Sequence, residues 1–156
     1  MIAIRPATID DLSVLLEFEQ GMITAERPMD ITLKRTETYY YDLPAMIDHE
    51  NTELAVAVEN GELIGCGYAR DVKARQCFEF DRYSYLGFMF TKIEHRGKGV
   101  NKRIMDYLYE WSLGRGIYEV RLEVYPNNPS AIKAYEKAGM HTSLHTMRVD
   151  LRKRES

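Results

Sequence analysis

The spacing of hydrophobic and polar positions predicts a mixed series of strands and helices. Hydrophobic residues recur at every second position in the predicted strands and at every third or fourth position in the predicted helices. Thr8, with Asp11 three residues later, resembles a capping box at the start of the first helix. The predicted elements, in chain order, are a strand over 2–5, a helix over 8–20, a loop over 21–30, a partly helical stretch over 31–50 interrupted near Pro44, strands over 53–58, 62–70 and 82–92, a helix from 100 to Gly114 or Gly116, a strand over 119–125, a helix over 129–138 and a strand over 140–151.

Turn and capping residues support several of these boundaries. Asn60-Gly61 between two hydrophobic runs is typical of a type I′ hairpin turn. Asn128 and Pro129 provide the N-cap and first position of the last helix, and Gly139 follows its end. Strands and helices mixed in this order predict the α/β (α+β) class, with a single mixed central sheet flanked by helices.

The composition is that of one ordinary globular domain. The chain has 156 residues and a mass of 18.2 kDa, with 45% hydrophobic and 29% charged residues, so we expect a single domain over residues 1–156. No hydrophobic run approaches the roughly 20 residues of a membrane span, and we expect no signal peptide. Cys66 and Cys77 are too few for a disulfide scaffold and lack the second pair of a zinc site. We therefore expect a cytoplasmic protein with no metal and no membrane partner.

The net charge of −3 conceals an asymmetry between the two halves of the chain. Residues 1–75 contain 7 Lys/Arg and 14 Asp/Glu, whereas residues 76–156 contain 14 and 10. The basic half could receive a phosphorylated ligand and the acidic half a cationic one, although surface solvation explains the same pattern. An acidic protein with short basic clusters is a poor candidate for nucleic-acid binding.

A glycine-bearing turn precedes the helix that starts at residue 100. Gly97 and Gly99 would let backbone N–H groups approach an anion closely, and the helix dipole adds positive charge at the same place. Four cationic side chains surround this turn: Arg96, Lys98, Lys102 and Arg103. The segment has neither the Walker pattern nor the third glycine of a dinucleotide-binding G-x-G-x-x-G pattern, which excludes both nucleotide loops.

Two motifs resemble those of the GNAT N-acetyltransferase superfamily. Residues 96–101, Arg-Gly-Lys-Gly-Val-Asn, resemble the family's R/Q-x-x-G-x-G/A acetyl-CoA loop. Residues 128–140, Asn-Pro-Ser-Ala-Ile-Lys-Ala-Tyr-Glu-Lys-Ala-Gly-Met, resemble its N-x-x-A-x-x-x-Y-E-K-x-G-F segment, and the order of predicted elements matches that fold. The sequence departs from the pattern at Asn101, where the family has a small residue, and at Ile93, where it often has proline.

The resemblance implies acetyl-CoA as the cosubstrate. Backbone N–H groups of the loop would hold the pyrophosphate, and the backbone of residues 89–91 would pair with the pantetheine arm between two splayed strands. Gly87 fits either the bulge that accompanies this splay or simple strand packing. The cofactor-binding residues implied in this way are Met89, Phe90, Thr91, Arg96, Gly97, Lys98, Gly99, Val100, Asn101 and Asn128.

The resemblance also implies a catalytic acid and suggests a base. Tyr135 matches the family tyrosine that protonates the departing thiolate, although it could also serve only in packing. Glu123, on the preceding strand, matches a glutamate that some family members use as the base when they acetylate peptide α-amines. The sequence leaves three further candidates for the base, namely Glu79, Asp81 and His95.

These motifs predict an N-acetyltransferase that acts on a primary amine of a small molecule or peptide, by direct attack through a tetrahedral intermediate. The acceptor pocket would come from the first helices, where carboxylates and tyrosines suit a cationic amine or simply solvate and pack. These residues are Glu17, Glu19, Glu26, Asp30, Glu37, Tyr39, Tyr40 and Tyr41. The alternatives are a non-catalytic acyl-CoA-binding or sensing domain, a covalent route through a cysteine, and an interaction domain with coincidental motifs. A homodimer stays open.

Overall fold

Five strands form one mixed sheet in the computed structural model, which describes residues 1–154. The strands are β1 (Ile2–Pro6), β2 (Thr52–Glu59), β3 (Glu62–Lys73), β4 (Arg82–Thr91) and β5 (Glu119–Arg121). They lie in the order β1-β2-β3-β4-β5, with antiparallel pairing from β1 to β4 and parallel pairing of β4 with β5. The single mixed sheet confirms the predicted fold class.

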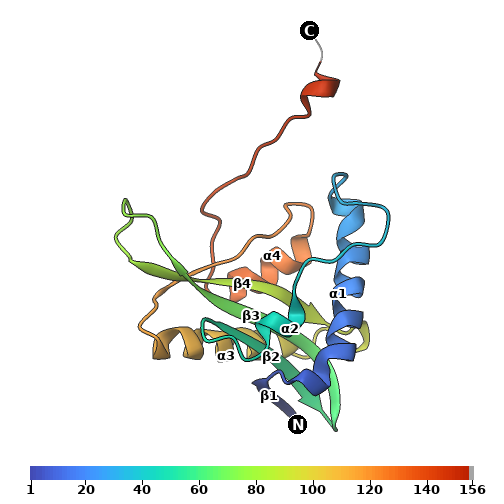
Figure 1. Ribbon diagram of the computed structural model, residues 1–156, viewed down its shortest axis with the longest axis vertical. Helices are drawn as coiled ribbons and strands as arrows, with labels where there is room; N and C mark the ends of the chain where they lie inside the picture. The colour runs from blue at the N-terminus through green and yellow to red at the C-terminus, as the bar shows by residue number, and fades with distance from the viewer. Residues whose placement is uncertain (155–156) are drawn as a thin grey trace.

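Helices cover both faces of the sheet (Figure 1). The helices are α1 (Leu12–Glu26), α2 (Leu43–Met46), α3 (Val100–Gly114) and α4 (Pro129–Lys137), and the short 3-10 helices are η1 (Ile9–Asp11), η2 (Arg27–Met29), η3 (Ile93–His95) and η4 (Leu151–Lys153). α1 and α2 pack on one face of the sheet, and α3 and α4 on the other. No helix among residues 1–154 has the length and apolar composition that crossing a membrane requires.

The alternation of side chains along β2 divides the core into two layers. Leu54 and Val56 point into the cluster that contains α1 and α2, whereas Ala55 and Ala57 point into the cluster beneath α3. All four side chains are buried because a strand directs successive residues to opposite faces. The alanines leave room for α3 to lie close to the sheet.

The turn and capping signals of the sequence are confirmed. Asn60 and Gly61 have φ angles of 51° and 77°, as a type I′ turn requires, and they join β2 to β3. The backbone N–H of Thr8 donates to Asp11 Oδ2 at 2.8 Å, which completes the capping box ahead of α1. Asn128 accepts the N–H of Ala131 and caps α4.

The first helix is longer than the sequence pattern predicts. The prediction ended it at residue 20 and placed a loop over 21–30, but α1 continues through Gly21 to Glu26. Gly21 serves close packing, because a Cβ there would lie 3.2 Å from the ring of Phe90. Glycine was therefore a misleading sign of a helix end.

Residues 31–50 are mostly irregular, with helix only in α2. Pro44 stands in the first turn of this short helix, where a missing N–H costs nothing, so it helps to start the helix and does not interrupt it. Asp42 caps the helix by accepting the N–H of Ala45.

Two predicted strands in the C-terminal part are wrong in extent. β5 ends at Arg121, so only the first three residues of the strand predicted over 119–125 form a strand. The strand predicted over 140–151 is absent, because residues 141–150 lie extended without a neighbouring strand to pair with. Residues 141–154 are called the C-terminal arm below; they project from the body of the molecule (Figure 1).

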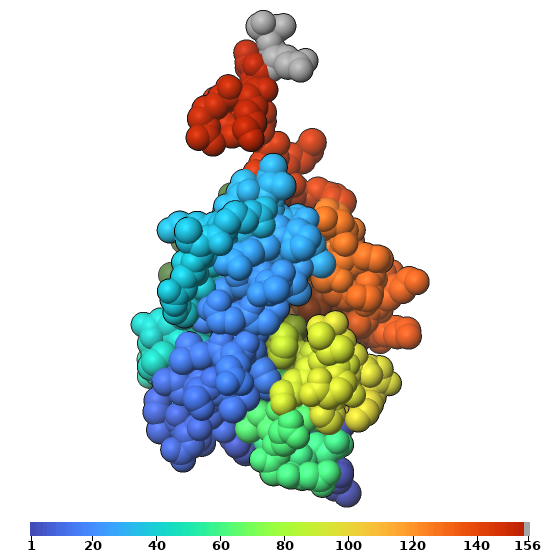
Figure 2. Space-filling model, turned by 90° about the vertical axis from the view of Figure 1, so that its right-hand side faces the viewer, coloured from blue at the N-terminus to red at the C-terminus, as the bar shows by residue number. Residues whose placement is uncertain are grey.

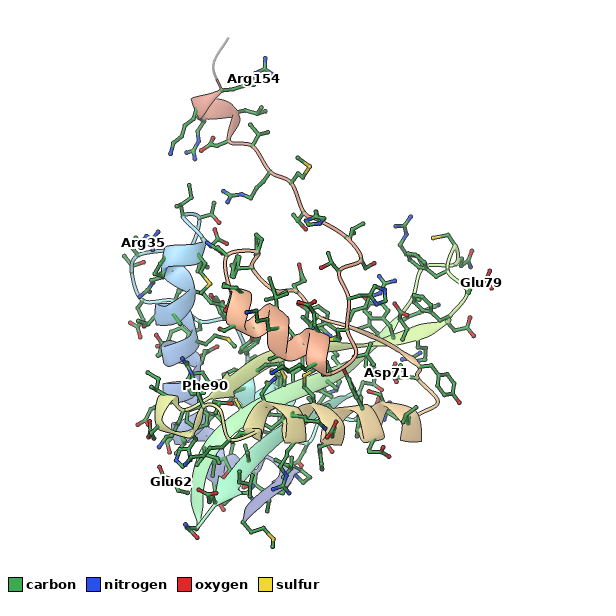
Figure 3. The ribbon with its side chains drawn as sticks, turned by 180° about the vertical axis from the view of Figure 1, so that it is seen from behind. Arg35, Glu62, Asp71, Glu79, Phe90 and Arg154 are labelled. Atoms are coloured by element: carbon green, nitrogen blue, oxygen red, sulfur yellow. The ribbon has the colours of Figure 1, made fainter. Side chains whose placement is uncertain are left out.

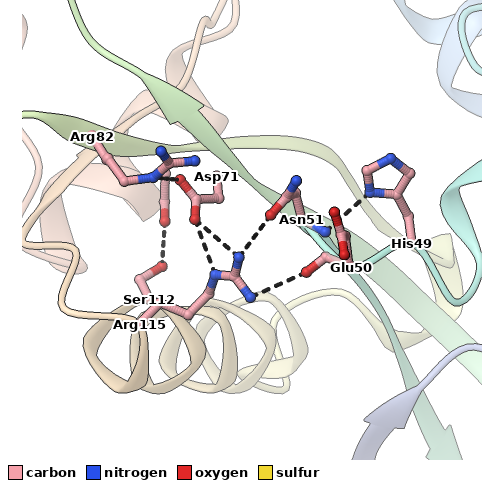
Figure 4. Close-up of polar contacts among 8 residues, drawn as sticks. His49, Glu50, Asn51, Asp71, Arg82, Ser112 and Arg115 are labelled. Carbon is pink, nitrogen blue, oxygen red and sulfur yellow. Dashed lines mark hydrogen bonds and ion pairs between the residues drawn. The ribbon is translucent and has the colours of Figure 1, made fainter.

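A polar network fixes the C-terminal end of α3 against the sheet (Figure 4). Arg115, at that end, donates to the Asp71 carboxylate at 3.1 Å and to the Asn51 side chain at 2.8 Å. Arg82 forms an ion pair with the same carboxylate, whose side chain is only 5% exposed. Ser84 and Ser112 share a buried hydrogen bond of 2.6 Å. These contacts hold α3 in place, and α3 in turn positions the loop at its other end.

Candidate active site

A bulge distorts β4 near its C-terminal end. The register between β3 and β4 shifts so that Phe88 and Met89 together face one residue of β3. Phe88 has a φ of 53°, an unfavourable conformation for a non-glycine residue, and its side chain is 1% exposed. Gly87 precedes the bulge and permits a close approach, since a Cβ there would lie 2.6 Å from the Tyr68 ring.

The parallel pairing between β4 and β5 ends early. It covers three residue pairs, and the last of them joins Tyr85 and Arg121. Beyond this point residues 86–91 pair only with β3, and residues 122–125 belong to no strand. One backbone edge of β4 is therefore open along the segment that contains Met89, Phe90 and Thr91.

The glycine loop lies at the end of this open edge. Gly97 and Gly99 both have a φ of 79°, and a Cβ at either position would meet no atom within 4 Å. Glycine is therefore favoured here because of the positive φ angle, and not because a side chain would lack space. The N–H of Arg103 donates to the Gly99 carbonyl at 3.1 Å. The N–H groups earlier in α3 have no carbonyl to bond within their own helix. An open loop, free amides and a positive helix end together fit a phosphate group.

The side chains around the loop leave its backbone accessible. Arg96 is exposed, and its Nε lies 3.4 Å from the carbonyl of Thr91. Lys98 is exposed beside His95, with 3.4 Å between Nζ and Nδ1. Asn101, which departs from the small residue of the motif, directs its amide nitrogen along α3 to the sulfur of Met105 at 3.6 Å.

Two glycines of β3 bring α3 and the bulge close to the sheet. A Cβ at Gly67 would lie 2.6 Å from the sulfur of Met89 and 2.9 Å from Ile104, and one at Gly65 would lie 3.1 Å from Val100. No sequence motif pointed to these two residues, although two glycines inside a predicted strand signal a close backbone approach.

Tyr135 projects from α4 and packs against the cluster beneath α3. Burial, with a smaller contribution from the Glu26 charge, raises the pKa of its phenol to about 12. The phenol therefore keeps its proton at neutral pH. Figure 2 shows α1, the loop ahead of α3, and α4 meeting on one face of the molecule.

Glu26 lies at the C-terminal end of α1, among tyrosines from several segments. It accepts the hydroxyl of Tyr40 at 2.8 Å, and burial raises the pKa of its carboxyl. Burial is the main cause of a raised pKa at four tyrosines on which the Glu26 charge also acts, namely Tyr40, Tyr41, Tyr125 and Tyr135. The sequence pattern predicted a loop at Glu26 because the predicted helix ended at residue 20, so it gave no sign that Glu26 lies near Tyr135.

Asp30 adds a second carboxylate to this group. It accepts the hydroxyl of Tyr125 at 2.8 Å, and hydrogen bonds from Thr32 and Tyr125 lower the pKa of its carboxyl to about 2. Glu26, Asp30, Tyr40 and Tyr125 are called the tyrosine–carboxylate cluster below. The cluster offers negative charge and aromatic surface, the two features that suit a cation.

The other predicted acceptor carboxylates are placed differently. Glu19 is fully buried, and its Oε2 accepts the backbone N–H groups of Tyr40 at 2.9 Å and Tyr41 at 2.8 Å. It therefore holds the loop that carries the tyrosines. Glu17 and Glu37 are exposed, and Glu37 accepts the hydroxyl of Tyr39.

Glu123, the predicted base, lies just beyond β5 and is exposed. Its Oε1 accepts the hydroxyl of Tyr85, on β4, at 2.8 Å. Burial, together with this bond, raises the pKa of Tyr85. The hydrogen bond places Glu123 across the opening between β4 and residues 122–125.

The other predicted bases and nucleophiles lie apart from the open edge. Glu79 and Asp81 precede β4, at the opposite end of that strand from Phe90, and Figure 3 shows Glu79 at the tip of its hairpin far from Phe90. Cys66 is buried, and burial raises the pKa of its thiol well above the usual value, whereas Cys77 is exposed in the same hairpin tip as Glu79. The geometry therefore disfavours Glu79 and Asp81 as bases and the covalent route.

The neighbours of His95 are acidic residues that do not belong to the open edge of β4. Its Nδ1 lies 3.7 Å from Glu59, and ligand atoms of His95, Glu62 and Glu94 lie within 4.8 Å of one another. The Glu62 carboxylate already pairs with Lys92 at 2.6 Å. The two glutamates are exposed and His95 is half-buried, and these groups form an ion-pair network at the surface.

Met89 of the open edge, Val100 after the glycine loop and Tyr135 of α4 all pack in one hydrophobic cluster. The chain belongs to the acetyltransferase (GNAT) family, whose model matches residues 20–140. This membership confirms the resemblance that the two motifs indicated.

Solved structures share the fold at low sequence identity. A tetramutant of a Bacillus halodurans protein is similar with a TM-score of 0.84 and 19% identity, over 96% of this chain and 99% of that one. A predicted acetyltransferase from Clostridium acetobutylicum, solved with acetyl-CoA, is similar with a TM-score of 0.73 and 18% identity over the whole of both chains.

A shorter match covers only part of the chain. A segment of 45 residues is 40% identical to streptothricin acetyltransferase of Escherichia coli. The match covers 29% of this chain and 26% of that protein.

Proposed function

We propose that the protein transfers the acetyl group of acetyl-CoA to a primary amine of a small molecule or peptide, in the cytoplasm. The observation that carries this proposal is the open edge of β4, which runs from the end of the β4–β5 pairing to the glycine loop. Family membership supports acetyl transfer, and the open edge and loop support acetyl-CoA as the donor.

The cosubstrate is held by backbone groups and by the positive end of α3. The backbone of Met89, Phe90 and Thr91 pairs with the amides of the pantetheine arm in the manner of an added strand. The loop from Arg96 to Asn101 binds the pyrophosphate through its N–H groups. Asn128, which already caps α4, contributes an amide at the other side of the opening.

Tyr135 and Glu123 carry the proton transfers. Acetyl-CoA supplies an activated thioester, and the acceptor amine attacks its carbonyl carbon directly, so that a C–N bond forms and the C–S bond breaks. Glu123 takes a proton from the amine, directly or through water, and Tyr135 donates a proton to the leaving sulfur. A phenol that is fully protonated at neutral pH is suited to the second role.

The tyrosine–carboxylate cluster recognises the acceptor. Its two carboxylates attract a cationic substrate, and its tyrosine rings provide cation–π contacts. The charge of Glu26 acts on Tyr135, which indicates that the cluster lies near the proposed acid. Streptothricin acetyltransferase, to which a segment of the chain is similar, fits an amine acceptor.

Thermal unfolding with and without acetyl-CoA tests the donor side of the proposal. Acetyl-CoA at about 100 times its Kd stabilises by about 2.7 kcal/mol, which corresponds to a rise in Tm of roughly 5–10 °C for a chain of this size. Adenosine phosphates should give a smaller rise. No rise at millimolar acetyl-CoA would contradict the proposal.

An amine panel then tests the acceptor side. We expect thiol release that depends on a cationic amine and weakens at high salt, because exposed charges are screened. Binding of acetyl-CoA with no turnover on a broad panel would instead favour the non-catalytic sensing domain.

A further inference from the structure

The loop that joins η2 to α2 lacks backbone–backbone hydrogen bonds over most of its length. Residues 30–42, called the acceptor loop below, form neither helix nor strand. Within the part of the chain that the structure describes, no backbone–backbone hydrogen bond involves residues 34–41. Side chains or water must therefore satisfy the polar groups of this backbone and limit its conformational freedom.

Glu19, on α1, is the buried side chain that holds the acceptor loop. Its Oε2 accepts the backbone N–H groups of Tyr40 at 2.9 Å and Tyr41 at 2.8 Å. The residue is 0% exposed, and among residues 1–154 its Oε1 has no hydrogen-bond partner. A buried oxygen without a partner lowers the stability of the fold. Stability alone therefore does not account for a carboxylate at this position.

Two further side chains hold earlier residues of the acceptor loop. Gln20, which is half-buried, donates to the carbonyl of Thr38 at 3.0 Å. Arg27 donates to two carbonyls nearer the start of the loop, at 3.1 and 2.8 Å, and both bonds are exposed. Among the described residues, only Glu19 bonds the backbone N–H groups of residues 40 and 41. The position of these two tyrosines therefore depends on Glu19.

The two tyrosines contact different parts of the candidate active site. The hydroxyl of Tyr40 donates to Glu26 at 2.8 Å, within the tyrosine–carboxylate cluster. The ring of Tyr41 packs against Phe88 of the β4 bulge, with 4.9 Å between the ring centroids. Because Glu19 bonds both backbone N–H groups, one carboxylate fixes the loop relative to the cluster and to the bulge at the same time.

Glu26 is the carboxylate of the cluster that suits a cationic substrate better. Asp30 already has a cationic neighbour, because Arg148 of the C-terminal arm lies 3.8 Å away. The partner of Glu26 is instead the neutral phenol of Tyr40. A cationic amine beside Glu26 would not have to displace another cation. The hydrogen bond from Tyr40 also fixes the direction of the Glu26 carboxylate.

We propose that Glu19 is a positioning residue for the acceptor amine: it holds Tyr40 in place, and Tyr40 orients the Glu26 carboxylate that receives the cationic substrate. This inference rests on the proposed function and adds how the acceptor is recognised. Glu19 is buried and acts through Tyr40, so its effect is on amine binding and not on acetyl-CoA binding. A change confined to amine binding raises the KM for the amine and leaves kcat unchanged.

Two variants of Glu19 separate its hydrogen bonds from its packing. Glu19→Gln keeps a carbonyl oxygen that can accept both N–H groups, whereas Glu19→Met has a similar length and no oxygen. Steady-state kinetics should show the KM for a cationic amine raised at least about tenfold in Glu19→Met and less than about threefold in Glu19→Gln, with kcat and the KM for acetyl-CoA nearly unchanged. Equal effects of the two variants on the amine KM, or a loss confined to kcat, would overturn the proposal.

Tyr40→Phe tests whether Glu19 acts through Tyr40. It removes the hydroxyl that Glu26 accepts and retains the ring and the backbone bonds, so it should by itself raise the amine KM. Combined with Glu19→Met it should raise that KM no further than the larger single effect, because both changes remove the same contact. Tyr39→Phe, at a neighbouring position that is 57% exposed, is the control and should leave the amine KM unchanged. No rise in Tyr40→Phe would overturn the proposal, even if Glu19→Met did not fold, and so would effects that multiply in the double variant.

Hydrogen exchange tests the contact without any substrate. The amides of Tyr40 and Tyr41 should exchange slowly in the wild type and in Glu19→Gln, and at least about tenfold faster in Glu19→Met, as measured by NMR. Fast exchange of both amides in the wild type would overturn the role of Glu19. A wild type that holds these amides but acetylates no amine would instead contradict the proposed function, so the two failures can be told apart.

Discussion

The buried surroundings of Tyr135 determine the protonation state of its phenol. Its position in the motif predicted a catalytic acid, but the sequence could not tell whether the side chain only packs. In the structure it does pack, and the same burial raises its pKa to about 12. Packing and catalysis are therefore compatible at this position.

Tyr135→Phe should lower kcat roughly 100-fold or more while the KM for acetyl-CoA changes little, because only the proton donor is lost. Steady-state kinetics with a cationic amine measure this. The phenol keeps its proton up to about pH 12, so its deprotonation should not lower the wild-type rate below about pH 11. Below that pH the wild type and the variant should have pH–rate profiles of the same shape. Tyr118→Phe, at a position 82% exposed, is the control and should behave as wild type.

Glu123→Gln removes the proposed base and retains a hydrogen-bond acceptor for Tyr85. We expect kcat to fall about 100-fold with little change in acetyl-CoA binding, measured by turnover and by thermal shift. Glu110→Gln, on the exposed side of α3, is the matched control. If Glu26→Gln lowered kcat and Glu123→Gln did not, the base would be Glu26.

Glu26→Gln should change stability in a pH-dependent way. Burial raises the pKa of Glu26, so the folded chain binds this proton more tightly than the unfolded chain, and the carboxylate costs stability as the pH rises through that raised pKa. The variant should therefore have a higher Tm than wild type at pH 7 and no advantage at pH 4, in thermal melts. Glu17→Gln, exposed on the same helix, should show no such difference.

At the scale of elements, glycines have three distinct roles that a sequence motif does not separate. Gly97 in the loop adopts a positive φ in open space, whereas Gly67 within β3 allows α3 and the bulge to approach. Gly21 lies inside α1 against the Phe90 ring and does not end the helix. The difference lies in what surrounds each glycine, and this depends on residues distant in the chain.

Gly97→Ala and Gly61→Ala form a matched pair that separates strain from binding. Both glycines have open space and nearly equal φ angles of 79° and 77°. Each substitution should therefore cost about 1 kcal/mol of stability. Only Gly97→Ala should also weaken acetyl-CoA binding, by about tenfold, because it changes the loop that holds the phosphate. Calorimetric titration and thermal melts measure both effects, and equal affinities in the two variants would contradict the loop assignment.

At the scale of the whole molecule, helices on both faces of one sheet bring distant parts of the chain together. α1, the loop ahead of α3, and α4 meet on one face of the molecule (Figure 2). The candidate site therefore depends on the complete fold and on no single segment.

The sequence by itself determined the features that depend on local chemistry. The Asn60-Gly61 turn, the cap at Asn128 and the two motifs were readable because each depends on neighbours a few residues away. The fold class and family followed from these features and were confirmed.

Only the tertiary structure decided the features that depend on distant partners. Gly21 packs against the ring of Phe90 inside α1, and the longer helix brings Glu26 to the tyrosines. The lack of a neighbouring strand kept residues 141–150 from forming the strand that their alternation predicts. The physical reason is the same in each case. A strand, a buried carboxylate or a close glycine contact is stabilised by atoms far away in the sequence, and a local pattern cannot say whether those atoms will be present.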